Sequence, residues 1–213
     1  MCTKPILLVA AALASCALAV GSARAGGVEA EIATNRPSGL TAKVKHETGP
    51  GQFPTDRTLV TFGYCQFAFE LPAGFRMDNS EPGRVSLVSQ DLGCVISFRV
   101  VGAFATEATS LAAAPYREFV AGQFPGAKVL EEFSMSADNR TGPAFEFEWG
   151  GGGMFQRCRL AYVPSRGGVL EFRVSASPAN FPVARQKFNT VVLSFRATDE
   201  NGRLNTPRIS DSL

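Results

Sequence analysis

The chain has a single histidine, His46, among its 213 residues. Nucleophilic catalysis by serine or cysteine usually depends on a histidine that the fold holds beside the nucleophile as a base. We expect His46 to lie in a linker, which cannot hold a base in this way. The chain also lacks a Gly-Lys-Ser/Thr phosphate loop and a dinucleotide-binding fingerprint. We therefore predict a protein that is not an enzyme, with no catalytic residue, cofactor or metal ligand assigned.

Charge of one sign is not in excess either. The chain has 21 Lys and Arg residues and 19 Asp and Glu residues. Lys4 and Arg24 belong to a segment that we expect to be removed, which leaves 19 basic residues against 19 acidic ones. Nucleic-acid binding depends on neutralising phosphates, and binding to an anionic membrane surface depends on a polybasic segment. Neither partner is predicted for a chain that is close to neutral.

Cysteine is scarce, with five residues in the chain. Two of them precede residue 26, which leaves Cys65, Cys94 and Cys158. Their spacing contains no Cys-x-x-Cys pair, so it does not favour a zinc site or thiol redox chemistry. Either all three are buried as small apolar residues or two of them form a disulfide in an oxidising compartment. If a bridge forms, we expect it between Cys65 and Cys94.

The chain has one long hydrophobic run, from Pro5 to Val20. Lys4 precedes this run, and Ala23-Arg24-Ala25 follows it with the small-x-small pattern that signal peptidase recognises. The run is too short for a comfortable membrane-spanning helix, which needs about 20 apolar residues. We therefore expect residues 1–25 to be a signal peptide, no membrane span, and a periplasmic or secreted protein.

A lipid anchor at Cys16 is the alternative to a cleaved signal. Leu13-Ala14-Ser15-Cys16 fits the lipobox at which a bacterial lipoprotein is acylated. Lipoproteins usually turn polar after this cysteine, whereas Ala17 to Val20 continue the hydrophobic run. The sequence therefore favours cleavage after Ala25 over acylation of Cys16.

Hydrophobic patterning locates one folded domain at residues 61–196. Residues 26–60 are rich in Gly, Pro, Thr and charge, a composition that cannot bury enough apolar surface to offset the loss of chain entropy. We expect a flexible linker there, and a disordered tail over residues 197–213. Of the 17 phenylalanines, only Phe53 lies outside residues 62–195. A domain of this size buries about two-thirds of the surface of its unfolded chain, enough for one stable core.

Alternation of apolar and polar residues predicts strands over most of this domain. The clearest are three consecutive strands, joined by turns at residues 150–153 and 165–168. Consecutive strands with short turns form an antiparallel sheet. The residues of these strands that we expect to face the core are Phe145, Phe147, Trp149, Cys158, Leu160, Tyr162, Leu170, Phe172 and Val174.

The charged residues of the same three strands are expected to share the other face. Their signs suggest ion pairs across neighbouring strands, each contributing about 0.2–1 kcal/mol. We interpret this charge ladder first as structural and second as a polar binding face. Its residues are Glu146, Glu148, Arg157, Arg159, Glu171 and Arg173.

Two helices are predicted in addition to the strands. One covers about residues 115–124, with Pro115 tolerated in its first turn. The other follows Asn180 and has apolar residues at helical spacing on its buried side. These residues are Phe181, Ala184, Phe188 and Val191. We therefore predict an α+β fold, with an antiparallel sheet of about six strands and helices packed on it as an α/β/α sandwich.

Two short motifs resemble the PsbP-like superfamily. The strand that runs into Phe69-Glu70-Leu71-Pro72-Ala73-Gly74-Phe75 is similar to its opening strand and Leu-Pro-x-Gly-aromatic motif. The helix that runs into Val192-Leu193-Ser194-Phe195 is similar to its terminal helix and Ser-Phe ending. The resemblance covers about residues 64–195 and implies an antiparallel sheet sandwiched between helices. It implies no activity, because members are accessory or partner-binding proteins of different kinds.

The sequence thus predicts an exported, non-catalytic accessory protein that binds another envelope or secreted protein. The glycines at 150–153 form a hairpin tip, which is either simply mobile or contacts a partner. The alternative function is a small-ligand-binding or enzymatic domain, whose pocket is assembled from residues far apart in the chain.

Mass spectrometry of the exported protein tests the signal peptide. We expect the mature chain to begin at Gly26, because Ala23 and Ala25 occupy the small positions before the cleavage site. A Cys16→Ser variant should be processed at the same bond. A mature chain that begins with a lipid-modified Cys16 would contradict this prediction and establish the lipoprotein alternative.

Overall fold

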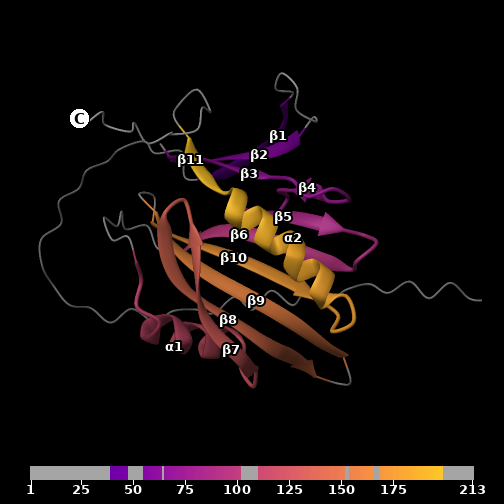
Figure 1. Cartoon of the computed structure of the whole chain (residues 1–213), viewed down its shortest axis with the longest axis vertical. Helices are drawn as coiled ribbons and strands as arrows, with labels where there is room; N and C mark the ends of the chain where they lie inside the picture. The colour runs from indigo at the N-terminus through magenta and orange to yellow at the C-terminus, as the bar shows by residue number, and fades with distance from the viewer. Residues whose placement is uncertain are drawn as a thin grey trace, which may run out of the picture. The chain divides into compact units, whose positions relative to one another are not determined.

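The computed structural model describes residues 39–47, 55–63, 65–101, 110–151, 154–165 and 168–198. The strands among them are β1 (Leu40–Glu47), β2 (Thr55–Phe62), β3 (Cys65–Glu70), β4 (Arg76–Asp78), β5 (Arg84–Ser89), β6 (Cys94–Val101), β7 (Lys128–Ala137), β8 (Arg140–Gly151), β9 (Met154–Ser165), β10 (Gly168–Ala176) and β11 (Arg196–Thr198). The helices among them are α1 (Ala114–Gln123) and α2 (Phe181–Ser194) (Figure 1). The predicted signal peptide, with Cys16, lies outside the described residues, as does most of the predicted tail. Neither described helix is long and apolar enough to cross a membrane.

Seven strands form one antiparallel sheet in the order β4-β5-β6-β10-β9-β8-β7. The three consecutive strands expected from the sequence are β8, β9 and β10, which pair in that order. The α+β fold is confirmed, and this sheet has seven strands where about six were expected. Strand β7, at one end of the sheet, carries a bulge at Leu130, where its register against β8 shifts between Val129 and Glu131.

The other four strands form a second antiparallel sheet in the order β1-β2-β3-β11. The expected linker over residues 26–60 is therefore wrong for β1 and for most of β2, and β11 extends into the expected tail. Along β1, Leu40 and Ala42 are half-buried, whereas Thr41 and Lys43 are exposed. A strand that buries only one face needs few apolar residues, so the composition of the segment did not reveal it.

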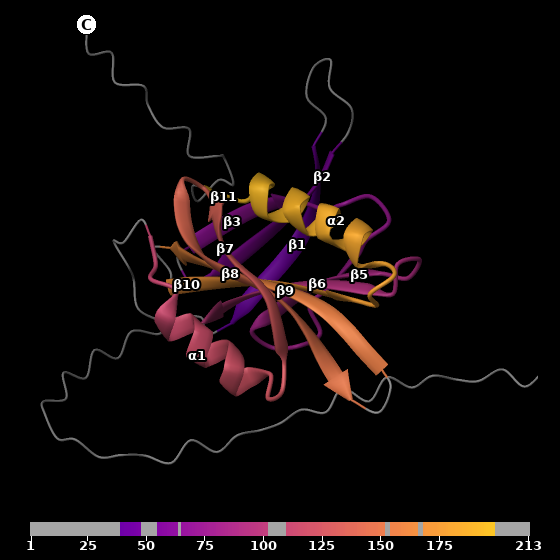
Figure 2. The ribbon, with the colours of Figure 1, turned by 60° about the horizontal axis from the view of Figure 1, so that its bottom comes forward.

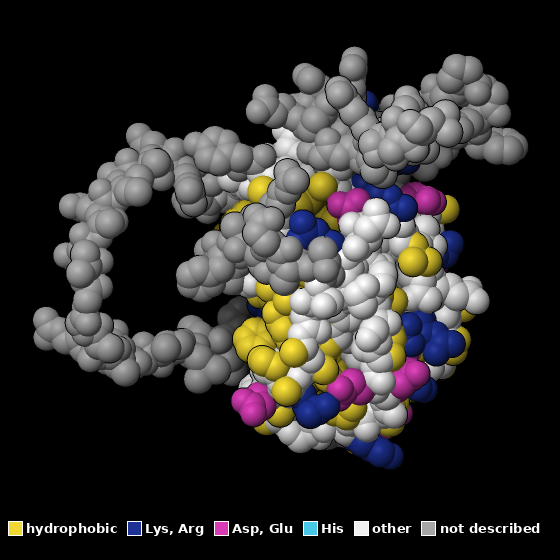
Figure 3. Space-filling view, turned by 60° about the vertical axis from the view of Figure 1, so that its left-hand side comes forward, with side chains coloured by type: hydrophobic (Ala, Val, Ile, Leu, Met, Phe, Trp, Pro, Cys, Tyr) yellow, Lys and Arg dark blue, Asp and Glu magenta, His cyan; other side chains and the backbone are white. Residues whose placement is uncertain are grey.

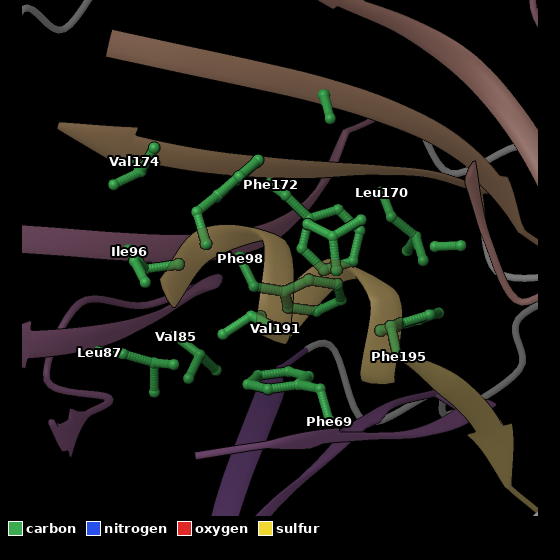
Figure 4. Packing of buried hydrophobic residues seen from close by; sticks show 14 of the residues in the cluster. Phe69, Val85, Leu87, Ile96, Phe98, Leu170, Phe172, Val174, Val191 and Phe195 are labelled. Atoms are coloured by element: carbon green, nitrogen blue, oxygen red, sulfur yellow. The ribbon is translucent and has the colours of Figure 1, made fainter. Parts of the chain in front are cut away.

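The main core lies between the two sheets and α2 (Figure 4). Phe98 of β6 is at its centre, with its ring centroid 5.2 Å from that of Phe172, 5.9 Å from Phe69 and 6.0 Å from Phe195. Aromatic rings at these separations attract each other beyond the effect of burial alone. Helix α2 buries all four residues predicted for its inner side, Phe181, Ala184, Phe188 and Val191.

A second, smaller core lies on the opposite face of the seven-stranded sheet. Val120 of α1 and the adjoining Phe124 pack there against Phe145 and Phe147 of β8. Cys158, Leu160 and Tyr162 of β9 complete this cluster. The sheet is thus covered on both faces, by α1 on one side and by α2 with the second sheet on the other (Figure 2).

Gly142 of β8 lies so close to the backbone of β9 that a side chain there would clash. A Cβ atom at this position would lie 1.7 Å from the carbonyl oxygen of Tyr162. We expect Gly142→Ala to destabilise the domain by at least about 2 kcal/mol, measured by urea denaturation, because backbone in two central strands would have to move.

Gly122→Ala in α1 is the matched control for this prediction. A Cβ atom on Gly122 meets no atom within 4 Å, so alanine should stabilise the helix by about 0.5–1 kcal/mol. Two glycine substitutions with the same small effect would contradict the close approach of β8 and β9.

Candidate functional site

The strand register divides the predicted charge ladder between the two faces of the sheet. On β8 and β9, Glu146 lies opposite Arg159 and Glu148 lies opposite Arg157, all on the α2 side. On β10, however, Glu171 lies opposite Tyr162, and Arg173 lies opposite Leu160. Residues that are paired across antiparallel strands share a face, so Glu171 and Arg173 point to the α1 side. The expectation of one polar face is therefore wrong.

Glu146 is the centre of the charge cluster on the α2 side, and only 1% of it is exposed. Arg157 donates from Nε and Nη2 to Oε1 at 2.8 and 2.6 Å. Arg159 donates from Nε and Nη2 to Oε2 at 3.1 and 2.6 Å. Arg185 of α2 approaches the same oxygen at 3.9 Å. Glu148 has no ion-pair partner among the residues that the structure describes, so two arginines converge on one carboxylate instead of forming a ladder.

Each of the two arginines of this cluster lies against one aromatic ring. The Arg159 guanidinium lies 4.5 Å from the ring centroid of Phe133 on β7, and that of Arg157 lies 5.2 Å from Phe181 at the start of α2. A buried carboxylate whose two oxygens are both bonded holds strands and helix in one arrangement. We therefore assign the Glu146 cluster a structural role.

Glu146→Gln tests this structural role. We expect it to lower the free energy of unfolding by about 3 kcal/mol, because a neutral amide leaves the buried Arg159 without a counter-ion. Glu148→Gln, on the same face of the same strand, should change stability by less than about 0.5 kcal/mol. Urea denaturation of both variants measures the difference, and equal effects would contradict the assignment.

The charge cluster on the α1 side contains a paired and an unpaired arginine. Both carboxylate oxygens of Glu171, which is 2% exposed, accept hydrogen bonds of 2.7 Å from Arg99 of β6. Arg173 donates from Nε to Oγ of Ser175 at 3.2 Å and lies 5.0 Å from the ring centroid of Phe124. No carboxylate pairs with Arg173 within the described part of the chain. Burial lowers the pKa of the Arg173 guanidinium.

Large apolar side chains are exposed where β7 begins, β8 ends and β9 begins. Val129 is 50% exposed, Leu130 37%, Trp149 37% and Phe155 58%. We call these four residues the apolar hairpin end. Gly150 and Phe155 are paired in register, which places Trp149 and Phe155 beside each other along the hairpin and on opposite faces of it. The sequence pattern assigned Trp149 to the core and did not single out Phe155.

Trp149 is held in place although it is partly exposed. Its ring lies edge-on to Phe124, with centroids 5.5 Å apart and an interplanar angle of 81°. Phe124 in turn packs on Phe147, at 4.8 Å between centroids. Figure 3 turns toward the viewer the side of the molecule on which α1 lies in Figure 1. Hydrophobic side chains form a band on this side, and charged side chains surround the lower end of the band. Gly152 and Gly153, part of the predicted tip, lie outside the described residues.

The cysteines of the described residues are not joined by a disulfide. The predicted Cys65–Cys94 bridge is not formed in this structure: Cys65 belongs to the second sheet, opposite Phe62, and Cys94 belongs to the seven-stranded sheet, opposite Ser89. Burial raises the pKa of Cys94 to about 11 and also raises the pKa of Cys158. Raised thiol pKa values disfavour the reactive thiolate.

His46 lies on β1 and not in a linker. Its Nδ1 is 2.5 Å from Oδ1 of Asp56, its partner in register on β2, and its side chain is 79% exposed. Among the described residues, no three His, Cys, Asp or Glu side chains come together as a metal site.

No protein-family model and no curated protein matches the chain. Among solved structures, the chain is similar to PsbP from the cyanobacterium Synechocystis, with 15% identity, a TM-score of 0.42, and coverage of 83% of this chain and 98% of that one. It is also similar to LpqN, described as involved in cell envelope biogenesis of Mycobacterium tuberculosis, with 12% identity, a TM-score of 0.39, and coverage of 75% and 91%. Both similarities concern the fold.

Proposed function

We propose that this chain is an exported, non-catalytic accessory protein that binds another envelope or secreted protein through the apolar hairpin end. The observation that carries the proposal is the exposure of Trp149 and Phe155 at the end of one hairpin, on its two faces, so that a partner that covers both encloses the hairpin end. Export is supported by the features of residues 1–25, a charged start, one apolar run and a small-x-small end.

The composition of the apolar hairpin end suits a protein interface. Tryptophan and phenylalanine are enriched at the cores of interfaces, and tryptophan often contributes most of the binding energy. Because Phe124 already orders the Trp149 ring, a partner that covers it would lose little further side-chain entropy. Phe155, at 58% exposed, supplies the larger unburied surface.

Polar residues surround the apolar hairpin end in the way expected of an interface rim. Lys128 and Glu148 are paired in register between β7 and β8, and Glu148 is not engaged in an ion pair within the described residues. Arg157, with 35% of its side chain exposed, follows Phe155 on the same strand face. Polar rims contribute specificity and association rate more than affinity.

The chemistry of the described side chains supports a non-catalytic role. The pKa values of the thiols of Cys94 and Cys158 are raised by burial, which disfavours nucleophilic cysteine chemistry.

Site-specific photo-crosslinking in envelope preparations of the source organism tests the proposal. A photoreactive residue at position 155 should capture one defined protein, and Trp149→Ser should reduce that product at least tenfold, in line with the loss of an aromatic anchor. The control is a photoreactive residue at Leu193, which is similarly exposed at 61% but lies at the end of α2 that leads into β11 of the other sheet.

Direct binding to the captured protein completes the test. Trp149 is the only tryptophan, so its emission should shift to shorter wavelength when the purified partner covers it, and Leu193→Ser should leave this shift unchanged. Crosslinking that is identical from positions 155 and 193, or a shift caused by phosphatidylglycerol vesicles and not by the protein, would overturn the proposal.

A further inference from the structure

A hollow with a volume of about 320 Å³ lies between the turn before β4 and the turn after β5. Ligand sites have volumes of about 300–1,000 Å³, so this hollow has room for a small molecule only. The residues that line it are Gly74, Phe75, Arg76, Val88, Gln90 and Asp91. Gly74 and Phe75 belong to the Leu-Pro-x-Gly-aromatic motif, which has no part in the proposed protein binding.

The motif fixes the wall of the hollow that carries Arg76. The backbone N–H of Phe75 donates to the carbonyl oxygen of Pro72 at 3.0 Å, and the Phe75 side chain is 8% exposed. Gly74 has a φ of +84°, which glycine adopts without strain. Arg76 follows as the first residue of β4 and lies opposite Val88 of β5. The backbone that carries Arg76 is therefore held in place before any ligand binds.

Hydrogen bonds also fix the turn that carries Asp91. The backbone N–H of Leu92 donates to Oγ of the buried Ser89 at 3.4 Å. Nδ2 of Asn180, just before α2, donates to the carbonyl oxygen of Leu92 at 2.8 Å. Because both walls of the hollow are fixed, a ligand that binds between them orders little further backbone.

Arg76 and Asp91 give the hollow one positive and one negative side chain. Both are exposed, and neither forms an ion pair with another of the residues that the structure describes. Asp78, on the same face of β4 as Arg76, accepts a hydrogen bond of 2.9 Å from the backbone N–H of Ser80. This bond, more than the charge of Arg76, lowers the pKa of the Asp78 carboxyl group. Arg76 and Asp91 are therefore available to opposite charges of a ligand.

Val88 adds an apolar surface to the hollow. Leu87, beside it on β5, points into the main core, so Val88 points to the opposite face of the sheet, where it is half-buried. Val95 of β6 lies opposite Val88 and is 40% exposed, so the apolar surface continues beyond the hollow. A complementary ligand has a carboxylate, an ammonium group and a small apolar part.

We propose that this hollow binds a small zwitterion, namely a free α-amino acid with an apolar side chain. The Arg76 guanidinium donates hydrogen bonds to its carboxylate, Asp91 accepts from its ammonium group, and Val88 and Val95 contact its side chain. The hollow is built on β4 and β5, whereas the apolar hairpin end belongs to β7, β8 and β9. The inference therefore goes beyond the proposed protein binding.

NMR titration of the isotope-labelled mature protein with L-leucine tests the site. We expect saturable shifts of the backbone amide signals of Gly74, Val88 and Asp91. N-acetyl-L-leucine, which lacks the positive charge, and L-leucinamide, which lacks the negative charge, should each bind at least tenfold more weakly than leucine. The absence of saturable shifts with leucine up to about 10 mM would overturn the proposal.

Two substitutions assign the charges of the ligand to their partners. Asp91→Asn should weaken leucine binding at least tenfold and remove the preference for leucine over N-acetyl-L-leucine. Arg76→Gln should weaken it by a similar factor and remove the preference for leucine over L-leucinamide. A variant that binds leucine as tightly as the wild type does would refute the role given to the substituted residue.

Asp78→Asn and Glu118→Gln are the matched controls. Asp78→Asn should keep or tighten leucine binding, because it removes a competing carboxylate on the same strand face as Arg76. Glu118→Gln, which removes an exposed carboxylate from α1, should leave binding unchanged. Equal losses of binding in Glu118→Gln and Asp91→Asn would show an effect of net charge and would overturn the proposal. None of these results bears on the Trp149 crosslinks, so the amino-acid site and the proposed protein binding can fail separately.

Discussion

Because the seven-stranded sheet is covered on both faces, few of its side chains can reach water. With α1 on one face and α2 with the second sheet on the other, side chains of the central strands point into packed layers on either side. A charged residue there needs a counter-ion within the fold, because an unpaired buried charge costs several kcal/mol. Glu146 and Glu171, one on each face, meet this need with arginines from neighbouring strands. Where the covering layers end, the Trp149 side chain is left partly exposed.

The sequence predicts the positions of most helices and strands, but not the face of the sheet on which their side chains lie. Helix α2 was predictable because Phe181, Ala184 and Phe188 follow a helical spacing, which is a local property. Strand β10 was predictable as well, but its orientation was not. In a strand that is covered on both faces, polar residues do not mark the side that faces water. Only the register, with Glu171 opposite Tyr162, decides which residues share a face.

The candidate sites depend on information that no single segment contains. Arg99 and Glu171, which are 72 residues apart in the chain, meet because β10 pairs with β6. The exposure of Trp149 depends on how far Phe124 and α1 extend over β8. The sequence does not predict strands β1 and β2, because a strand that packs on only one side can consist of mostly polar residues. These features arise from pairing and packing between distant segments, which alternation along the chain does not encode.

The bulge at Leu130 protects the edge strand β7 from pairing with the same strand of another copy of the chain. Strand β7 is the last strand at its end of the sheet order, and a regular edge of this kind is a template for adding further strands. The extra residue interrupts the even spacing of backbone donors and acceptors, and the exposed carboxylate of the neighbouring Glu131 repels an identical edge. Growth into stacked fibrils from this side is therefore disfavoured by the strand's own irregularity.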